Sequence, residues 1–282
     1  MKSVSPYIYI GYYCNNNCIF CSESDEYLEK LEMKTLKKIK EEILEVRKNY
    51  DFVSFMGREP TLRKDLSSIL KFAGKLNFKQ ISVATNGRMF SYPKFVKKIL
   101  STGLNQVGFS LSGAKVSTHD KQTQVPGSFK QIIQGISNVV RMKKPEVSVL
   151  VNITLNRLNY LELDEMIKLL IKLGIREINI LFIAPLSRRS YTKKIIMKMS
   201  KLGKFVFKII KKYSKNPELK ILLVEFLPCS LPKEARNYFF TCLEKNPNKV
   251  KIPLCKNCKF EEKCDGVLQS YIDLYGFKEF KI

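Results

Sequence analysis

Residues 7–21 read YIYIGYYCNNNCIFC, and this stretch decides the fold. Its first part is rich in residues of high strand propensity and predicts a strand over Tyr7–Tyr12. Three cysteines follow directly, at Cys14, Cys18 and Cys21. In parallel sheets and barrels, ligands gather at the carboxyl ends of the strands. The stretch therefore predicts a loop of cysteines at a ligand-binding edge.

The following part of the chain alternates between helical and strand periodicity. Five further strands are expected over 52–56, 80–84, 106–111, 147–154 and 177–183. The intervening helices are expected over 34–50, 63–76, 94–102, 129–142 and 161–173. Parallel strands need a crossover, usually a helix, between them. The pattern therefore predicts an α/β fold, either a doubly wound sheet or an incomplete (β/α)6 TIM-like barrel.

This alternation ends after Pro185. A lysine-rich helix between Lys194 and Lys215, a strand over 219–226, a segment rich in Cys, Pro and Asn, and a closing helix over 267–275 follow. The last third has too little regular structure to be stable without a metal. We expect a partial barrel over 1–186 and a small irregular C-terminal metal-cluster domain over 187–282.

The composition excludes several classes of protein. The chain has 282 residues, 45% of them hydrophobic, with 13 Gly and 11 Pro, which excludes a disordered or collagen-like chain. No apolar run approaches the roughly 20 residues of a membrane span, and the N-terminus lacks a secretory signal. We therefore expect a cytoplasmic protein. Thiols stay reduced there, so eight cysteines in two separate groups favour two metal sites.

The net charge of +24 comes mainly from lysine. The lysines of the helix after Pro185 recur every three or four residues, which is typical of a solvated helix face. Such a charge also attracts nucleic acid, an anionic lipid or an acidic peptide. Lysine enrichment marks proteins from hot habitats as well, so the charge alone does not identify a partner.

The first cysteine group is too small for a structural zinc site. Such a site normally takes four Cys or His ligands, and the only histidine of the chain, His119, is distant in sequence. Three thiolates can instead hold three irons of a 4Fe-4S cluster and leave the fourth iron open. An open iron can bind a substrate or cofactor, so the spacing favours a catalytic cluster.

The C-x3-C-x-aromatic-C pattern after the first strand resembles that of the radical S-adenosylmethionine enzymes. This resemblance implies that the open iron binds S-adenosylmethionine, which is cleaved reductively to methionine and a 5'-deoxyadenosyl radical that abstracts hydrogen from a substrate. It also implies that Phe20 packs on the adenine. The protein would position the cofactor and exclude water.

A second motif follows the second strand. Gly57-Arg58-Glu59-Pro60-Thr61 resembles the family's Gly-Gly-Glu-Pro motif, although Arg58 replaces the second glycine. The resemblance implies that Gly57 and Glu59 contact the methionyl ammonium of the cofactor. The alternative for Glu59 is a carboxylate that only complements a helix dipole.

Polar residues at three further strands match the family's cofactor-binding strand ends. Asn86 follows the third strand, Ser110 and Ser112 end the fourth, and Asn152 lies in the fifth. The resemblance implies contacts with the methionyl carboxylate or the ribose. The two serines are two residues apart and should share one side of a strand. Turn stabilisation by Asn86 and strand termination by the serines are the alternatives.

The second cysteine group reads Cys255-x2-Cys258-x5-Cys264, with Cys229 upstream. Four thiolates suit either zinc or an iron-sulfur cluster. The tail resembles the twitch domain, a shortened SPASM domain, and this implies a second, auxiliary 4Fe-4S cluster. Cys242 competes with Cys229 for the fourth place; we favour Cys229 and expect Cys242 to be a small buried side chain.

Together these features predict a radical S-adenosylmethionine enzyme. Family relatives with such tails often modify ribosomally made peptides, so a peptide or protein substrate is expected. RNA or a small metabolite is the alternative substrate, and a zinc-stapled nucleic-acid-binding protein is the alternative class. The chemistry needs an electron donor of the flavodoxin or ferredoxin type.

Overall fold

The computed structural model describes residues 5–21, 32–183, 185, 192–240 and 246–282. Eight strands form one sheet in sequence order, and each pairs in parallel with the next. These strands are β1 (Tyr7–Gly11), β2 (Phe52–Gly57), β3 (Gln80–Thr85), β4 (Gln106–Leu111), β5 (Ser148–Leu155), β6 (Glu177–Phe182), β7 (Lys220–Val224) and β8 (Phe239–Phe240).

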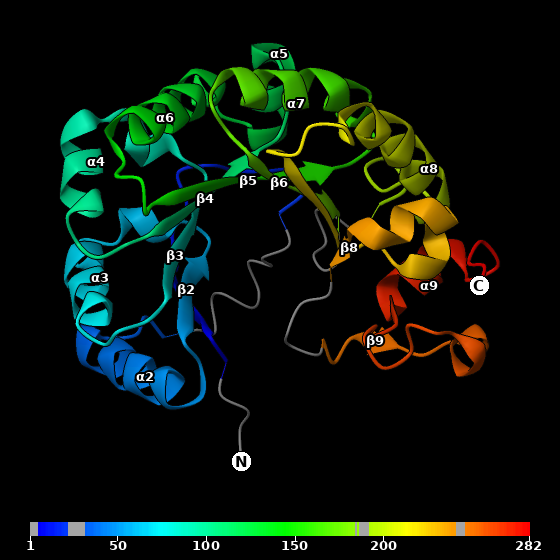
Figure 1. The fold of residues 1–282 in the computed structure, drawn as a ribbon, viewed down its shortest axis with the longest axis horizontal. Helices are drawn as coiled ribbons and strands as arrows, with labels where there is room; N and C mark the ends of the chain where they lie inside the picture. The colour runs from blue at the N-terminus through cyan, green and yellow to red at the C-terminus, as the bar shows by residue number, and fades with distance from the viewer. Residues whose placement is uncertain (1–4, 22–31, 184, 186–191, 241–245) are drawn as a thin grey trace.

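Helices cover the outer side of the curved sheet, which forms an open arc (Figure 1). They are α2 (Leu36–Asn49), α3 (Leu66–Gly74), α4 (Pro93–Leu100), α5 (Val116–Thr123), α6 (Ser128–Met142), α7 (Leu163–Lys172) and α8 (Met199–Ile210). This architecture is the incomplete α/β barrel that the sequence predicts, so the fold class is confirmed.

The core lies between the outer face of the sheet and the helices. In β5, Val149, Val151 and Ile153 are buried and alternate with half-buried residues that include Asn152. This period of two places one face of the strand against apolar helix stripes and leaves the other on the concave side. The concave face is therefore free to carry polar side chains.

The predicted elements are confirmed with small shifts at their ends, but three differences matter. We did not predict α5. The lysine-rich helix is shorter than expected: α8 spans Met199–Ile210, and Lys194 and Lys215 lie outside this helix. The sheet also continues beyond residue 186, since β7 pairs with β6. The division into units 1–186 and 187–282 thus cuts across one continuous sheet, and it stays a prediction.

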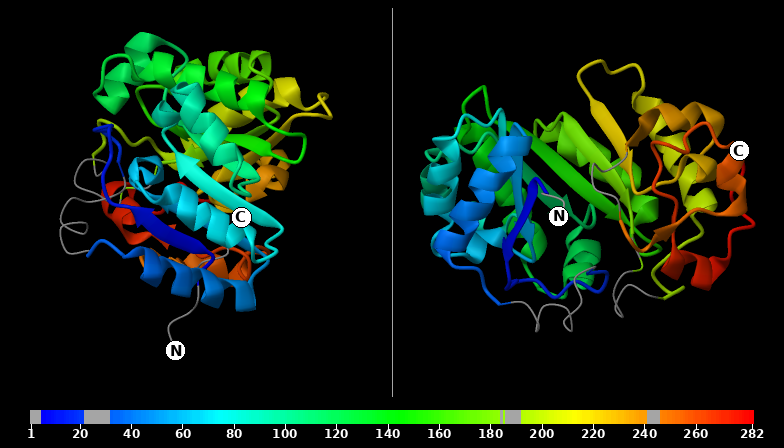
Figure 2. Two further views of the ribbon diagram at one scale, coloured as in Figure 1. Left: turned by 90° about the vertical axis from the view of Figure 1, so that its left-hand side faces the viewer. Right: turned by 90° about the horizontal axis from the view of Figure 1, so that it is seen from below.

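The C-terminal segment is mostly short elements. It contains the antiparallel pair β9 (Lys249–Val250) and β10 (Val267–Leu268), followed by α9 (Gln269–Tyr275). In Figures 1 and 2 this segment, orange to red, lies beside the β7–β8 end of the arc. Among the described residues no helix is long and apolar enough to cross a bilayer.

Candidate functional site

The first cysteine loop follows β1 at the carboxyl edge of the sheet, and residues after β3 hold its near side. The Asn86 amide donates to Asn15 Oδ1 at 2.7 Å and lies 3.7 Å from Cys14 Sγ. The Asn16 backbone N–H donates to the same sulfur at 3.3 Å. The site residue Asn86 therefore contacts the cysteine loop directly.

Arg88 is a second anchor on this side, and the sequence analysis missed it. Its guanidinium donates to the Asn15 carbonyl and, at 3.1 Å, to Asn16 Oδ1. Its Nε donates to Gln131 Oε1 on α6 at 2.5 Å. Arg88 thus connects the cysteine loop to a packed helix of the barrel.

The C-terminal end of α5 holds the far side of the loop. The backbone N–H groups of Asn17 and Ile19 donate to the carbonyls of Thr123 and Gln122, each at 2.9 Å. These carbonyls belong to the last turn of α5, where backbone acceptors have no partner within the helix. The Asn17 side chain also donates to Gln124 Oε1 at 2.9 Å. The cysteine loop therefore supplies hydrogen-bond donors to the terminal carbonyls of α5.

A buried polar network fixes α5 to the ends of β4 and β5. Gln122 is 1% exposed, donates to the Ser112 carbonyl and accepts from the Asn156 amide. Asn159 donates to the same Ser112 carbonyl at 3.1 Å. Buried polar groups persist when their hydrogen bonds are satisfied, and such networks rigidify their surroundings.

His119 belongs to this network. Its Nδ1 accepts the Ser112 backbone N–H at 3.2 Å, and its ring packs edge-on to Phe129. Burial lowers the pKa of His119 to about 4, and the nearby Asp120 charge opposes this only in part. At neutral pH the imidazole is therefore uncharged and serves as an acceptor.

Glu59 lies in the middle of the near side and is 1% exposed. One oxygen accepts from the Thr61 backbone, the Thr61 hydroxyl and the Thr85 hydroxyl, while the other accepts from the Asn86 backbone at 2.7 Å. Burial raises the pKa of Glu59, although these hydrogen bonds lower it in part. The carboxylate thus connects Asn86 to β2 through contacts within the protein. A contact with the cofactor stays a prediction.

Gly57 has a clear structural reason to be glycine. Its φ is +123°, and a Cβ at this position would lie 2.5 Å from the Gly11 carbonyl oxygen. The Arg58 backbone N–H donates to that same oxygen at 2.9 Å. Residues with a side chain rarely adopt such a backbone conformation. The ends of β1 and β2 therefore approach closely just before the cysteine loop.

The polar row on the concave face extends further than predicted. Ser110, Asn152 and Asn179 are register partners across β4, β5 and β6. Asn179 donates to Asn152 Oδ1 at 3.0 Å. This contact orients the Asn152 amide. Asn179 was missed because the resemblance that indicated Asn152 included no residue of the sixth strand.

Two further residues predicted to contact the cofactor, Ser112 and Phe20, lie outside this polar row. Ser112 follows the last residue of β4 and is 4% exposed, whereas Ser110 is exposed. That both serines share one side of the strand and contact the cofactor stays a prediction. Phe20 is half-buried and packs against the apolar core beside the cysteines. Its contact with adenine stays a prediction.

Two thiols of the first group, Cys14 and Cys21, lie near enough for the charge of Cys21 to affect the pKa of Cys14. Burial raises the pKa of Cys14, and the charges on Glu59 and Cys21 raise it further, while hydrogen bonds from Asn16 and Asn86 lower it. Across the described ranges, no three Cys, His, Asp or Glu side chains stand in metal-ligating geometry. The assignment of Cys14, Cys18 and Cys21 as ligands stays a prediction.

The second group brings four cysteines from distant positions into one region. Burial raises the pKa of Cys229 to about 12, and the charges of the other three cysteines add to it. Those three are Cys264, Cys258 and Cys255. Cys255 lies in the 3-10 helix Pro253–Asn257, and the Cys258 N–H donates to its carbonyl at 3.0 Å. Cys242 lies outside the described residues.

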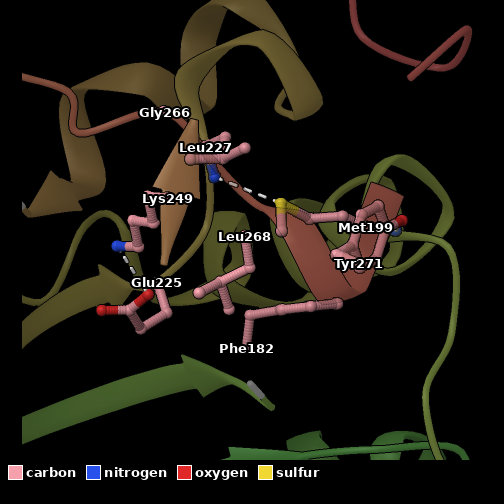
Figure 3. A pocket seen from close by; sticks show the side chains of 8 residues that line it. All are labelled: Phe182, Met199, Glu225, Leu227, Lys249, Gly266, Leu268 and Tyr271. Carbon is pink, nitrogen blue, oxygen red and sulfur yellow. Dashed lines mark hydrogen bonds and ion pairs between the residues drawn. The ribbon is translucent and has the colours of Figure 1, made fainter. Parts of the chain in front are cut away.

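A small pocket, partly open to solvent, lies where the C-terminal segment meets β6 and β7 (Figure 3). Its walls are mainly apolar, but Glu225 and Lys249 form an ion pair of 2.9 Å beside it. Glu225 has a φ of +62°, a strained conformation for a residue with a side chain. A neighbouring cavity shares this pair and reaches Cys264. The second cysteine group therefore adjoins the pocket.

A parallel partial barrel with a cysteine loop at the carboxyl end of its first strand defines a class of enzyme. The sequence profile of the Radical SAM superfamily matches residues 8–170. The chain belongs to this superfamily of enzymes, which use a 4Fe-4S cluster and S-adenosylmethionine.

Several curated relatives carry the name Probable GTP 3',8-cyclase. One from Saccharolobus islandicus (strain L.S.2.15 / Lassen #1) is 32% identical over 187 residues, which cover 63% of this chain and 56% of the relative. One from Sulfurisphaera tokodaii is 25% identical over 198 residues, covering 68% and 60%. The chain thus spans a little over half the length of these relatives.

Solved structures share the fold. Streptococcus suis SuiB bound to precursor peptide SuiA aligns with a TM-score of 0.62 at 18% identity, covering 77% of this chain and 48% of SuiB. The enzyme anSMEcpe with bound AdoMet and Cp18Cys peptide aligns with a TM-score of 0.63 at 14% identity, covering 98% and 92%. The fold likeness therefore extends through the C-terminal segment.

Proposed function

We propose that Cys14, Cys18 and Cys21 hold the 4Fe-4S cluster that activates S-adenosylmethionine in this chain. The observation that carries this proposal is the double anchoring of their loop, by Asn86 on one side and by α5 on the other. Three thiol sulfurs suit the donor set of such a cluster, and they leave one iron for the cofactor. A preorganised loop would keep the thiolates in place when the cluster changes its charge.

When bound, the cluster and cofactor supply the one-electron cleavage that generates a 5'-deoxyadenosyl radical. The chain's own residues would bind the cofactor and orient the cysteine loop. Glu59 fixes Asn86 through its backbone N–H, and the Asn86 side chain fixes the loop. Ser110 and Asn152 would face the ribose from the concave side, with Asn179 orienting Asn152. Phe20 would close the adenine side and exclude water.

A matched pair of cysteine variants tests this assignment. Cys18→Ala should abolish 5'-deoxyadenosine formation under reducing conditions, because the cluster would lose one of three thiolates. Cys258→Ala is the control, since it lies in the second group and should leave the first cluster intact. Release of 5'-deoxyadenosine by Cys18→Ala at the wild-type rate would refute the first ligand set.

We also propose that Cys229, Cys255, Cys258 and Cys264 hold an auxiliary 4Fe-4S cluster in a C-terminal twitch-like unit, within residues 187–282. The mutual influence of these thiols on the pKa of Cys229 supports the proposal, because it requires that they lie near one another. Iron analysis after anaerobic reconstitution should find about eight irons in the wild type and about four in Cys258→Ala. A wild type with four irons, or with zinc, would contradict it.

For the substrate we propose a peptide or protein side chain, with an electron donor of the flavodoxin or ferredoxin type. The support is a fold likeness to a peptide-bound enzyme that covers 98% of this chain, including its C-terminal segment. A net charge of +24 would also steer an acidic peptide. Acidic peptides should then stimulate the formation of 5'-deoxyadenosine.

A nucleotide is the second candidate, because relatives named Probable GTP 3',8-cyclase are 32% identical to this chain. That similarity covers 63% of the chain. The discriminating experiment supplies deuterated GTP or deuterated acidic peptides and measures deuterium in 5'-deoxyadenosine. Deuterium from GTP alone would replace the peptide proposal; salt-dependent RNA binding would instead favour RNA.

A further inference from the structure

We propose that Arg88 is a positioning residue that holds the cysteine loop against the barrel and places a fixed positive charge beside the first cluster. This inference rests on the proposed function, because the cluster is the group that the charge would act upon. Arg88 itself is neither a cysteine nor a residue of the motifs that resemble those of the family.

Arg88 connects the cysteine loop to α6 through its hydrogen bonds. Arg88 follows β3, and its guanidinium reaches the loop at the Asn15 carbonyl and at Asn16 Oδ1. Its Nε is held by Gln131 on α6. Since the guanidinium is planar and has five donors in a rigid fork, one side chain can contact both elements at once. A lysine at this position would keep the charge but lose the fork.

The partners of Arg88 are neutral. A carbonyl and two side-chain amides receive its hydrogen bonds, so no carboxylate among these partners cancels its charge. Asn15 and Asn16 are the residues directly after Cys14, so the guanidinium binds the segment that carries this proposed ligand. Because a nearby cation stabilises a cluster that has gained an electron, we expect Arg88 to raise the reduction potential.

Three variants separate anchoring from charge. Arg88→Gln removes both, Arg88→Lys keeps the charge, and Gln131→Leu keeps Arg88 but removes its support on α6. Arg176→Gln is the matched control, because Arg176 precedes β6 at the opposite edge of the sheet and pairs with exposed Glu218. Each full-length variant is compared with the wild type before and after reconstitution of the clusters.

Hydrogen exchange measures the anchoring in the protein before reconstitution. The amides of Asn17 and Ile19 are the reporters, because both donate to α5 carbonyls. Loss of a charge-assisted hydrogen bond should accelerate their exchange on the order of tenfold in Arg88→Gln. Gln131→Leu should show a smaller increase, and Arg176→Gln should exchange like the wild type. Unchanged exchange in both Arg88→Gln and Gln131→Leu would overturn the anchoring role.

A redox titration followed by electron paramagnetic resonance measures the charge effect. The first cluster should have a more negative midpoint potential in Arg88→Gln than in the wild type, whereas Arg88→Lys should restore most of the difference. A wild-type potential in Arg88→Gln would overturn the electrostatic role. A wild type that takes up no cluster at Cys14, Cys18 and Cys21 would instead refute the proposed function, while the exchange result would still decide the anchoring.

Discussion

At the scale of single residues, the site is built from side chains that hold other protein groups. Glu59 accepts four hydrogen bonds from within the chain. The Asn86 amide donates to Asn15 and to the sulfur of Cys14. A motif in the sequence shows which residue is special, but not which atoms contact it. Burial and hydrogen bonding assign these two residues to positioning the loop.

His119 should make the fold sensitive to acid. Its folded pKa of about 4 lies below the ordinary 6.5, so its contribution to stability is complete above pH 6.5 and is lost as the pH falls toward 4. Between pH 7.5 and pH 5 the free energy of unfolding should fall by about 2 kcal/mol through this group. Urea unfolding of the metal-free protein at both pH values measures the loss.

His119→Asn is the control for this prediction, because its amide oxygen can accept the Ser112 N–H in place of Nδ1 and does not titrate near neutrality. The variant should lose less stability than the wild type over the same pH interval. Equal losses in both proteins would show that other groups cause the acid sensitivity.

At the scale of elements, α5 is the support of the cysteine loop. Its eight residues, VSTHDKQT, carry a weak apolar stripe, and for this reason the sequence did not predict the helix. It is held by buried polar contacts through Gln122 and His119, and by backbone N–H groups of the cysteine loop that donate to its last carbonyls. These contacts come from β4, β5 and the residues after β1, which are far apart in the sequence.

Gln122→Ala should therefore destabilise the loop as well as the helix. The change leaves the buried Ser112 carbonyl with fewer donors and the Asn156 amide without its acceptor. The free energy of unfolding should fall by about 1–3 kcal/mol, and iron retention at the first cluster should decrease. Calorimetry and iron analysis during dialysis provide the measurements.

Gln124→Gly is the matched change one position beyond the helix. Gln124 has a φ of +55°, which glycine adopts without steric cost, so the variant should be as stable as the wild type or slightly more stable. It loses only the contact with Asn17. If Gln124→Gly released iron as readily as Gln122→Ala, the buried network would not be the cause.

At the scale of the whole molecule, the C-terminal segment is joined to the barrel at the end of β7. Glu225 and Lys249 are 24% and 10% exposed in their side chains and form an ion pair of 2.9 Å. Breaking a partly buried pair by removing one partner leaves the other charge poorly solvated. This pair connects the sheet to β9, which precedes three of the four proposed C-terminal ligands.

Lys249→Met should loosen this connection. We expect a loss of about 1–3 kcal/mol in the free energy of unfolding and faster hydrogen exchange in β9 and β10 than in β1–β6. Lys278→Met is the control, because Lys278 is exposed and follows α9. Uniformly faster exchange over the whole chain would mean that the pair supports global stability and not this junction.

The sequence alone determined the order of strands and helices and the two cysteine groups, because hydrophobic periodicity and ligand spacing are local properties. Only the tertiary structure decided which side chains hold the cysteine loop. Arg88, Gln122 and Asn179 act across gaps of 27 residues or more, to Asn15, Asn156 and Asn152. Such pairings arise when parallel strands align in register and bring their carboxyl ends to one edge, and no local pattern records them.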